Sequence, residues 1–365
     1  MLLVGFGLGA LTVIAITAIV NRGELLMPTN TAGSTAALSS PSLRPSPTLT
    51  QSPAGPGPRA GAVLLYDPQN RGVILFGGSH TVPHADGTNE GVSTGDTWLW
   101  DGKSWQRFEA SGPPARSAAM AAYDSARHVI VLFGGAGPTG TGAALLLNDT
   151  WTWDGARWTE MHPSHVPDGR IRAGMAFDER RGVATMFGGE LVAGESTETW
   201  TWDGADWTLQ NPATSPTRRH FASMAYDPLH GDTVLFGGSM PGVRLNDTWT
   251  WDGTTWTKQA GAPPVASGWS YMTYDPAANQ LVAFVYFALD NHEPARYTMT
   301  WDGTRWTDRT ETGGPSPRAD VGIAHDDATG QVVLHGGSFN QPQPFAETWV
   351  WDGSKWSLWS PTAGA

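Results

Sequence analysis

A tryptophan-rich segment recurs six times along the chain and constrains its fold more than any other feature. In its fourth copy it reads Asn-Asp-Thr-Trp-Thr-Trp-Asp-Gly-Thr-Thr-Trp, at residues 246–256. The Trp-Asp-Gly cores begin at Trp100, Trp153, Trp202, Trp251, Trp301 and Trp351. The period is therefore about fifty residues, which is typical of propellers and other arrays of one repeated unit.

Each copy predicts two strands joined by a turn. Trp249 and Trp251 are two residues apart and project from one face of a strand, while Thr248 and Thr250 project from the other. The Asp-Gly that follows supplies turn chemistry, so that Trp256 can return opposite Trp251 as an aromatic cross-strand pair. Burying one tryptophan removes about 150–250 Å² from water, an upper bound of roughly 4–6 kcal/mol. We therefore expect the tryptophans to be the main adhesive of the fold.

One repeat contains four predicted strands. In the fourth repeat they lie at residues 221–226, 233–238 and 247–251, with a last strand from residue 256. Four antiparallel strands repeated around an axis are the blades of a β-propeller, so the sequence predicts an all-β, six-bladed propeller over residues 59–365. Each repeat holds its own four strands. Blade one must then close the ring by packing on blade six, and we expect this seam to be the least protected joint.

Two further features recur with the tryptophans. Glycine pairs end the second strands at Gly77-Gly78, Gly134-Gly135, Gly188-Gly189, Gly237-Gly238 and Gly336-Gly337. Closing tryptophans stand at Trp105, Trp158, Trp207, Trp256, Trp306 and Trp356. Over residues 59–359 this pattern resembles the kelch repeat of the galactose oxidase central-domain-like superfamily. It departs from the family by having Trp in place of the usual Tyr on the third strand. The fifth repeat also has Val285-Tyr286 for its glycine pair and Met299 for its first Trp.

The two N-terminal segments differ from the repeats in composition. Residues 1–20 are apolar and long enough to span a bilayer, with nothing basic before them, which favours an uncleaved transmembrane anchor over a cleaved signal peptide. Residues 21–58 are rich in Pro, Ser, Thr and Gly and predict a disordered linker. We expect a propeller tethered to a membrane on its extracytoplasmic side, with a secreted protein as the alternative.

Charge and cysteine content exclude several classes of function. The net charge is −12 and lysine occurs only at Lys103, Lys258 and Lys355, which disfavours a nucleic-acid partner. The chain has no cysteine, so disulfides, zinc–thiolate sites and thiol catalysis are excluded. The copper chemistry of galactose oxidase, which the resemblance would otherwise suggest, needs a crosslinked cysteine and cannot operate here.

The loops between second and third strands vary most between repeats, and their face of the propeller is the candidate binding face. Arginines recur at this face, seven residues before the aromatic residue that ends each first strand, with Ser267 in the fifth repeat. They are Arg59, Arg116, Arg170, Arg219 and Arg318. In kelch proteins this region grips acidic peptides, which the resemblance makes possible here through bidentate carboxylate capture. Alternatively, each arginine bonds neighbouring groups and joins the blades.

Four neighbours of this series occur once each and are the more specific candidates for binding: Arg172, His220, Trp269 and Asp320. Trp269 belongs to no repeat position and suits a binding platform, although it could instead plug the channel.

No catalytic set or cofactor site is assembled by the sequence. His80, His84 and Asp86, or Asp290, His292 and Glu293, could hold a metal, but their spacing is not specific and solvated loops are the better interpretation. The leading hypothesis is a binding module for a protein, peptide or acidic glycan. The alternatives are a carbohydrate-active or oxidoreductase-like enzyme that uses the central pocket, and a surface protein without a discrete ligand.

Overall fold

The computed structural model of the chain describes residues 48–52, 55–84, 89–138, 145–261, 263, 268–287, 294–339 and 341–360. Within these ranges every regular element is a β-strand. The predicted anchor, residues 1–20, and residues 21–47 of the predicted linker lie outside them. No helix among the described residues is long and apolar enough to cross a membrane.

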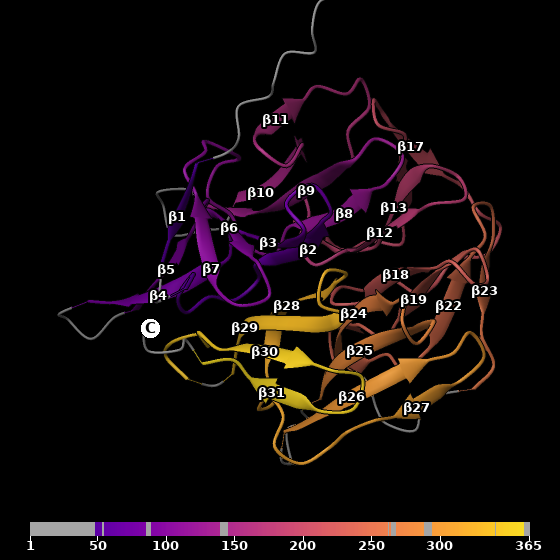
Figure 1. Ribbon diagram of the computed structural model, residues 1–365. Coiled ribbons are helices and arrows are strands. Elements are labelled where there is room, and N and C mark those ends of the chain that lie inside the picture. Colours follow the sequence, from indigo (N-terminus) through magenta and orange to yellow (C-terminus); the bar gives the residue numbers. More distant parts are fainter. Residues whose placement is uncertain are drawn as a thin grey trace, which may run out of the picture. The chain divides into compact units, whose positions relative to one another are not determined.

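Apart from three two-stranded hairpins, the described strands form six antiparallel sheets, with five strands in blade one and four in each of the others, which confirms the predicted six-bladed propeller (Figure 1). The first strands of the blades are β2 (Val63–Asp67), β8 (Met120–Asp124), β12 (Gly174–Asp178), β18 (Ser223–Asp227), β24 (Trp269–Asp275) and β28 (Ala319–Asp326). The second strands are β3 (Gly72–Phe76), β9 (Val129–Gly137), β13 (Val183–Phe187), β19 (Asp232–Phe236), β25 (Gln280–Phe287) and β29 (Gln331–Ser338).

The tryptophan-rich segments form the outer half of each blade. The third strands are β6 (Thr97–Trp100), β10 (Leu145–Trp153), β16 (Thr199–Trp202), β22 (Thr248–Trp251), β26 (Ala295–Trp301) and β30 (Thr348–Trp351). The fourth strands are β7 (Trp105–Phe108), β11 (Trp158–Met161), β17 (Trp207–Gln210), β23 (Trp256–Lys258), β27 (Trp306–Asp308) and β31 (Trp356–Leu358). The strands of the fourth repeat lie within two residues of the predicted positions.

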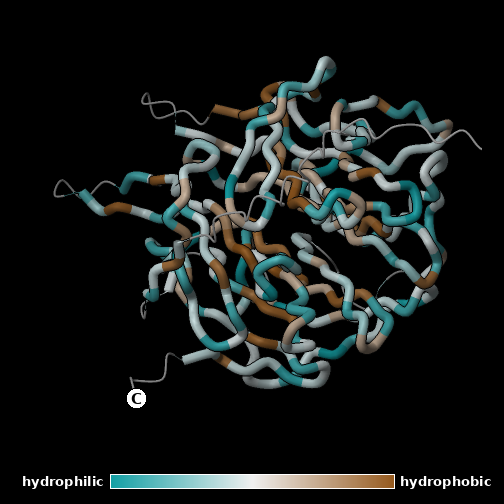
Figure 2. Tube along the Cα trace, turned by 45° about the horizontal axis from the view of Figure 1, so that its top comes forward, coloured by the Kyte–Doolittle hydropathy of each residue, from teal (hydrophilic) through white to brown (hydrophobic). Residues whose placement is uncertain are grey.

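The first strands form the wall of a central channel. Each contacts the first strand of the next blade, and β28 contacts β2, so the ring is closed. In Figure 1 the chain runs in order around this ring, from indigo blade one to yellow blade six. Hydrophobic residues concentrate in the strands of the ring and hydrophilic ones in its outer loops (Figure 2).

Tryptophan pairs hold the blades together as the sequence predicts. In every blade the last Trp of the third strand faces the first Trp of the fourth, with ring centroids 5.2–5.6 Å apart. The indole Nε1–H of each fourth-strand Trp also donates to a buried Thr of the preceding blade, at 2.8–3.0 Å. Each blade joint is therefore sealed by the same directional bond.

At the seam between blades one and six, which the sequence predicts to be the least protected joint, the contacts of the other joints recur. The seam has the same tryptophan bond, from Trp105 to Thr348 at 3.0 Å. In addition, Trp359 packs edge-on against Trp100, with centroids 5.0 Å apart, and donates to the Lys103 carbonyl at 3.0 Å. The C-terminal end of blade six therefore reaches across to blade one.

Blade one has one strand more than the sequence predicts. Strand β1 (Leu49–Gln51) pairs antiparallel with β7 on the outer edge. These residues fall within the segment 21–58 that composition assigns to a disordered linker. Residues 49–51 of that segment are thus part of the propeller. Composition did not indicate this strand, because main-chain pairing needs no particular side chains.

Short hairpins fill the variable connections between second and third strands. They are formed by β4 (Ser79–Pro83) with β5 (Asn89–Ser93), β14 (Glu190–Leu191) with β15 (Gly194–Glu195), and β20 (Ser239–Met240) with β21 (Val243–Arg244). The hairpins lie on the face where the first strands begin, since bridges join Ala60 to Ser79, Ile171 to Glu190 and His220 to Ser239. We call this the variable face.

Candidate functional site

The five repeated arginines are built into the blades. Each guanidinium donates to the carbonyl of the first glycine of its blade's glycine pair, at 2.9–3.3 Å. Each also pairs, at 2.6–2.9 Å, with an acidic residue at the start of the third strand: Asp96, Asp149, Glu198, Asp247 and Glu347. The same carboxylates accept the indole N–H of the first third-strand Trp, at 2.6–3.0 Å. We call this arginine–acid–tryptophan set the clamp.

Burial and charge show how tightly the clamps are held. The side chains of Arg59, Arg116, Arg170, Arg219 and Arg318 are at most 4% exposed. Burial would raise the pKa of the five partner carboxyls. The hydrogen bonds from arginine and tryptophan outweigh it, and the pKa of each lies below its ordinary value. These contacts agree with the interpretation that the repeated arginines have a structural role and do not bind a ligand.

Blade five has lost the clamp as a unit. Tyr297 occupies the acidic position and Met299 the tryptophan position, while the arginine position is Ser267, which lies outside the described residues. The three losses belong together because an arginine or carboxylate without its partner would be costly to bury.

A second ring of residues surrounds the mouth of the channel, two positions after the clamp arginines. It consists of Gly61, Ala118, Arg172, Phe221 and Asp320, which we call the mouth ring. All five have φ between 53° and 68°, in the left-handed region that disfavours side chains. The backbone N–H groups of Gly61, Ala118, Arg172 and Phe221 each donate to the carbonyl of the ring member before them, at 2.7–3.1 Å. Four non-glycine residues therefore keep a strained backbone conformation around the opening, held by these hydrogen bonds.

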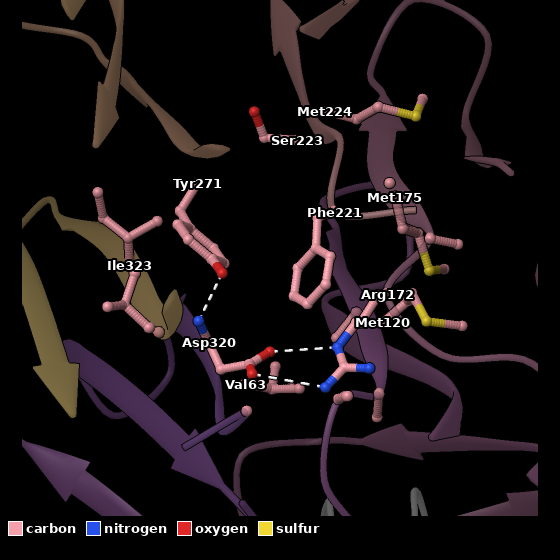
Figure 3. Close-up of a pocket in the computed structure, with 18 of the residues that line it drawn as sticks. Val63, Met120, Arg172, Met175, Phe221, Ser223, Met224, Tyr271, Asp320 and Ile323 are labelled. Atoms are coloured by element: carbon pink, nitrogen blue, oxygen red, sulfur yellow. Dashed lines mark hydrogen bonds and ion pairs between the residues drawn. The ribbon is translucent and has the colours of Figure 1, made fainter. Parts of the chain in front are cut away.

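Arg172 and Asp320 meet at this mouth although 148 residues separate them (Figure 3). The guanidinium of Arg172 lies 3.3 Å from Asp320 and 3.5 Å from Glu190, and 4.5 Å above the ring of Phe221. The Tyr271 hydroxyl accepts the backbone N–H of Asp320 at 2.5 Å. Burial lowers the pKa of Arg172, but the carboxylates of Asp320 and Glu190 more than offset it, so the pKa is raised.

An aromatic strip extends from this pair across blades four to six. His220, Phe221, Trp269, Tyr286 and Phe339 follow one another with centroids 4.9–6.0 Å apart. Trp269 stacks on Tyr286 with the ring planes 8° apart. The guanidinium of Arg244 lies over the ring of Trp269, 4.5 Å from its centroid. Trp269 is thus packed between neighbouring side chains on the variable face.

His220 has both ring nitrogens next to polar groups of the hairpins. Its Nδ1 is 3.4 Å from a carboxylate oxygen of Glu195, and its Nε2 is 3.3 Å from the Ser239 hydroxyl. Burial lowers the pKa of His220 and outweighs the carboxylates of Glu190 and Glu195, which favours the neutral imidazole.

A cavity of about 180 Å³ lies at the mouth of the channel. Arg172, Phe221, Tyr271 and Asp320 line it near the mouth, and Met120, Met175 and Met224 lie at its wall (Figure 3). The wall is therefore soft and apolar, whereas the rim carries charge of both signs. Such a site can bind a polar group by hydrogen bonds at the rim and an apolar group below it.

The structure therefore connects all four candidates that occur once, Arg172, His220, Trp269 and Asp320, in one network of contacts through Phe221, whereas the repeated arginines are paired within the clamps. Sequence reasoning missed Phe221, Tyr271, Glu190, Glu195 and Arg244. Phe221 could have been found by aligning the second residue after each clamp arginine. Glu190 directly follows the Gly188-Gly189 pair, but its proximity to Arg172 depends on the hairpin.

Among the described residues, no three His, Asp or Glu side chains come together in a way that could hold a metal ion. His84 pairs with Glu90 at 3.1 Å, while Asp86 and the loop with Asp290, His292 and Glu293 lie outside the described ranges. No model of a known protein family matches the chain, and comparison with curated proteins gives no significant match.

Proposed function

We propose that this protein is a kelch-type binding module whose variable face recognises a protein or peptide partner around the mouth of the channel. The observation that carries the proposal is that Arg172 pairs with Asp320 at the mouth and that Phe221 connects Arg172 with His220 and Trp269, so that residues of four blades form one contact network. The kelch assignment is supported by the glycine pairs, which all have positive φ. It is also supported by the hydrogen bonds that the first glycine carbonyl of each pair accepts from the clamp arginine.

The chemistry of the partner follows from the long distances between the Arg172 guanidinium and its neighbouring carboxylates. Its nitrogens lie 3.3–3.5 Å from Asp320 and Glu190, longer than charge-assisted bonds of good geometry. An acidic side chain of a peptide can therefore approach Arg172 closely, while an adjoining apolar side chain packs on Phe221 and Trp269. A peptide that carries an acidic residue beside an aromatic one fits this rim best.

The hairpins enlarge the face beyond the mouth. Val192 at the turn of the blade-three hairpin is 93% exposed, and Leu145 and Val243 are 52% and 40% exposed at neighbouring connections. A stable protein interface buries about 800 Å² per partner, more than a small mouth supplies. Contacts with these apolar side chains would provide the remainder.

Selection from a random peptide library displayed on phage, against the full chain, tests the proposal. Peptides with acidic and aromatic residues should be enriched on the native protein and lose at least about tenfold in affinity on Arg172→Gly or Trp269→Ala. Arg305→Ala is the matched control, because Arg305 is 79% exposed beside a Trp-Asp-Gly turn, away from the mouth. Equal binding to all variants would refute recognition at the mouth.

A carbohydrate-active enzyme is the second candidate, favoured by the carboxylates of Glu195 and Glu190 near His220. Glu195 lies 3.4 Å from His220, and Glu190 and Asp320 share Arg172. Hydrolysis of chromogenic glycosides by the native protein, lost in Glu195→Gln, would support this function over simple binding. Copper–thioether chemistry stays excluded because the chain has no cysteine.

We also propose that residues 1–20 tether the propeller to a membrane on its extracytoplasmic side. The support is the apolar sequence alone. Membrane fractionation of the full chain, with a chain lacking residues 1–20 as control, tests it. Equal release of both chains to the soluble fraction would contradict a tether.

A further inference from the structure

The mouth of the channel presents one positive and one negative side chain beside an apolar cavity. Arg172 and Asp320 are 29% and 19% exposed, so a ligand can reach both of them, and their closest atoms are 3.3 Å apart. Both belong to the mouth ring, whose backbone hydrogen bonds fix their main chains on blades three and six. Two opposite charges are therefore held side by side on a rigid support, and part of each is open to solvent.

The rest of the mouth ring gives this pair no polar neighbour of the same kind. The equivalent positions of the other four blades hold apolar residues: Gly61, Ala118, Phe221 and Trp269. The Arg172–Asp320 pair is thus the polar edge of an otherwise apolar ring of positions. A ligand with one polar end is oriented by such an edge, with its polar end at the pair and its apolar end in the channel.

The charges around the pair disfavour a small ligand with a single charge. Glu190 is a second carboxylate near Arg172, at 3.5 Å, so an anion that reaches the guanidinium also approaches two carboxylates. A cation that reaches Asp320 approaches Arg172. A peptide can offset this repulsion by contacts with the hairpins, but a small molecule cannot. A zwitterion that lies antiparallel on the pair satisfies both side chains and adds no net charge.

The cavity at the mouth accepts an apolar group. It measures about 180 Å³, and its wall includes Met120, Met175, Met224 and Ile323. In Figure 3, Ile323 lies on one side of this space, and Met175 and Met224 lie on the other. An apolar cavity of about 150 Å³ is large enough to hold benzene, so this one has room for the side chain of leucine or phenylalanine. Methionine side chains adapt their shape readily, which suits a wall around such a group.

We propose that the mouth of the channel binds a free α-amino acid with an apolar side chain. The ammonium and carboxylate groups of an α-amino acid are attached to one carbon, so they can contact Asp320 and Arg172 together. The side chain is attached to the same carbon and can enter the cavity. A molecule that lacks one of the three groups loses one of the three contacts. The inference goes beyond the peptide recognition proposed above, because it needs only the pair and the cavity.

Calorimetric titration of the full chain with L-leucine and three of its relatives tests the site. The relatives each lack one group: 4-methylpentanoate lacks the ammonium, 3-methylbutylamine lacks the carboxylate, and glycine lacks the side chain. L-Leucine should bind saturably, and each relative should bind at least about tenfold more weakly. Absence of saturable leucine binding, or equal binding of any relative, would overturn the proposal.

Two variants assign the binding to the charged pair. Arg172→Gly and Asp320→Asn should each weaken leucine binding at least about tenfold. Asp320 has a φ of 53°, which asparagine adopts more readily than most residues, so Asp320→Asn removes the charge without adding backbone strain. Arg305→Ala, away from the mouth, should bind leucine like the native protein. Unchanged leucine binding by either mouth variant would contradict the assignment and overturn the proposal.

The titrations also separate this site from the proposed peptide recognition. If peptides selected on phage bind at the mouth and leucine does not bind, this inference fails and the proposed function stands. If leucine binds with the expected selectivity and no peptide is enriched, the proposed function fails and the amino-acid site stands.

Discussion

The clamps and the Arg172–Asp320 pair use the same two chemical groups in different ways. In the clamps the arginine is at most 4% exposed, and its closest carboxylate contact is 2.6–2.9 Å, with a backbone carbonyl as a further acceptor. At the mouth Arg172 is 29% and Asp320 is 19% exposed, and their closest approach is 3.3 Å. The repeated pairs therefore stabilise blades, whereas the pair that occurs once remains open to competition from a ligand.

Removing one clamp should have the largest effect on stability. Arg219→Ala removes the buried partner of Asp247, which keeps only Trp249 and the more distant Lys258 at 3.8 Å, and it removes the donor to the Gly237 carbonyl. We expect a loss of about 3–5 kcal/mol in the free energy of unfolding, measured by chemical denaturation. A loss below about 1 kcal/mol would show that the clamp is dispensable and would remove the contrast with the mouth.

A histidine at the seam should make stability depend on pH. His335 occupies the position of Phe76, Phe133, Phe187 and Phe236, and burial, with the charges of Arg59 and Arg318, lowers its pKa from 6.5 to about 3. Its unfolded form binds a proton that the folded form excludes, so stability is complete above pH 6.5 and falls as the pH drops toward 3.

The expected loss between pH 6.5 and pH 5 is about 2 kcal/mol. His335→Phe restores the repeat and should flatten this part of the profile, measured by thermal unfolding at a series of pH values. The clamp carboxyls, whose pKa values are lowered, lose their contribution only at lower pH, so both proteins should still unfold in stronger acid. An unchanged slope in His335→Phe would assign the acid sensitivity to other groups.

Loss of one Trp–Thr hydrogen bond between blades should lower the free energy of unfolding by less than loss of a clamp. Thr150→Val removes the acceptor of Trp207, and Thr348→Val removes the acceptor of Trp105 at the seam. Each should cost about 1–2 kcal/mol. Thr348→Val should cost at least as much as Thr150→Val, because His335 also bonds Thr348, at 2.9 Å. If it costs clearly less, the seam is the weak joint that the sequence predicts.

Periodicity explains why the fold was predictable and the site was not. Trp251 facing Trp256, the glycine pairs and the strand positions all follow from residues close in sequence. Arg172 and Asp320 occupy the same repeat position in blades three and six, but they meet only because six blades close into a ring, and no short segment of sequence shows which blades face each other. The sequence could show that Arg172, His220, Trp269 and Asp320 break the pattern, but not that they face each other. Strand β1 was missed for a different reason, since its pairing depends on the main chain.

The smallest effect on stability should come from the mouth itself. Arg172 has a φ of 56°, a conformation that is unfavourable for a residue with a side chain and favourable for glycine. Gly61 occupies the equivalent position in blade one. Arg172→Gly should therefore change the free energy of unfolding by less than about 1 kcal/mol, since relief of backbone strain offsets the loss of a partly exposed ion pair. The measurement is chemical denaturation beside Arg219→Ala. A cost as large as that of Arg219→Ala would make Arg172 another structural arginine and leave the variable face without its recognition centre.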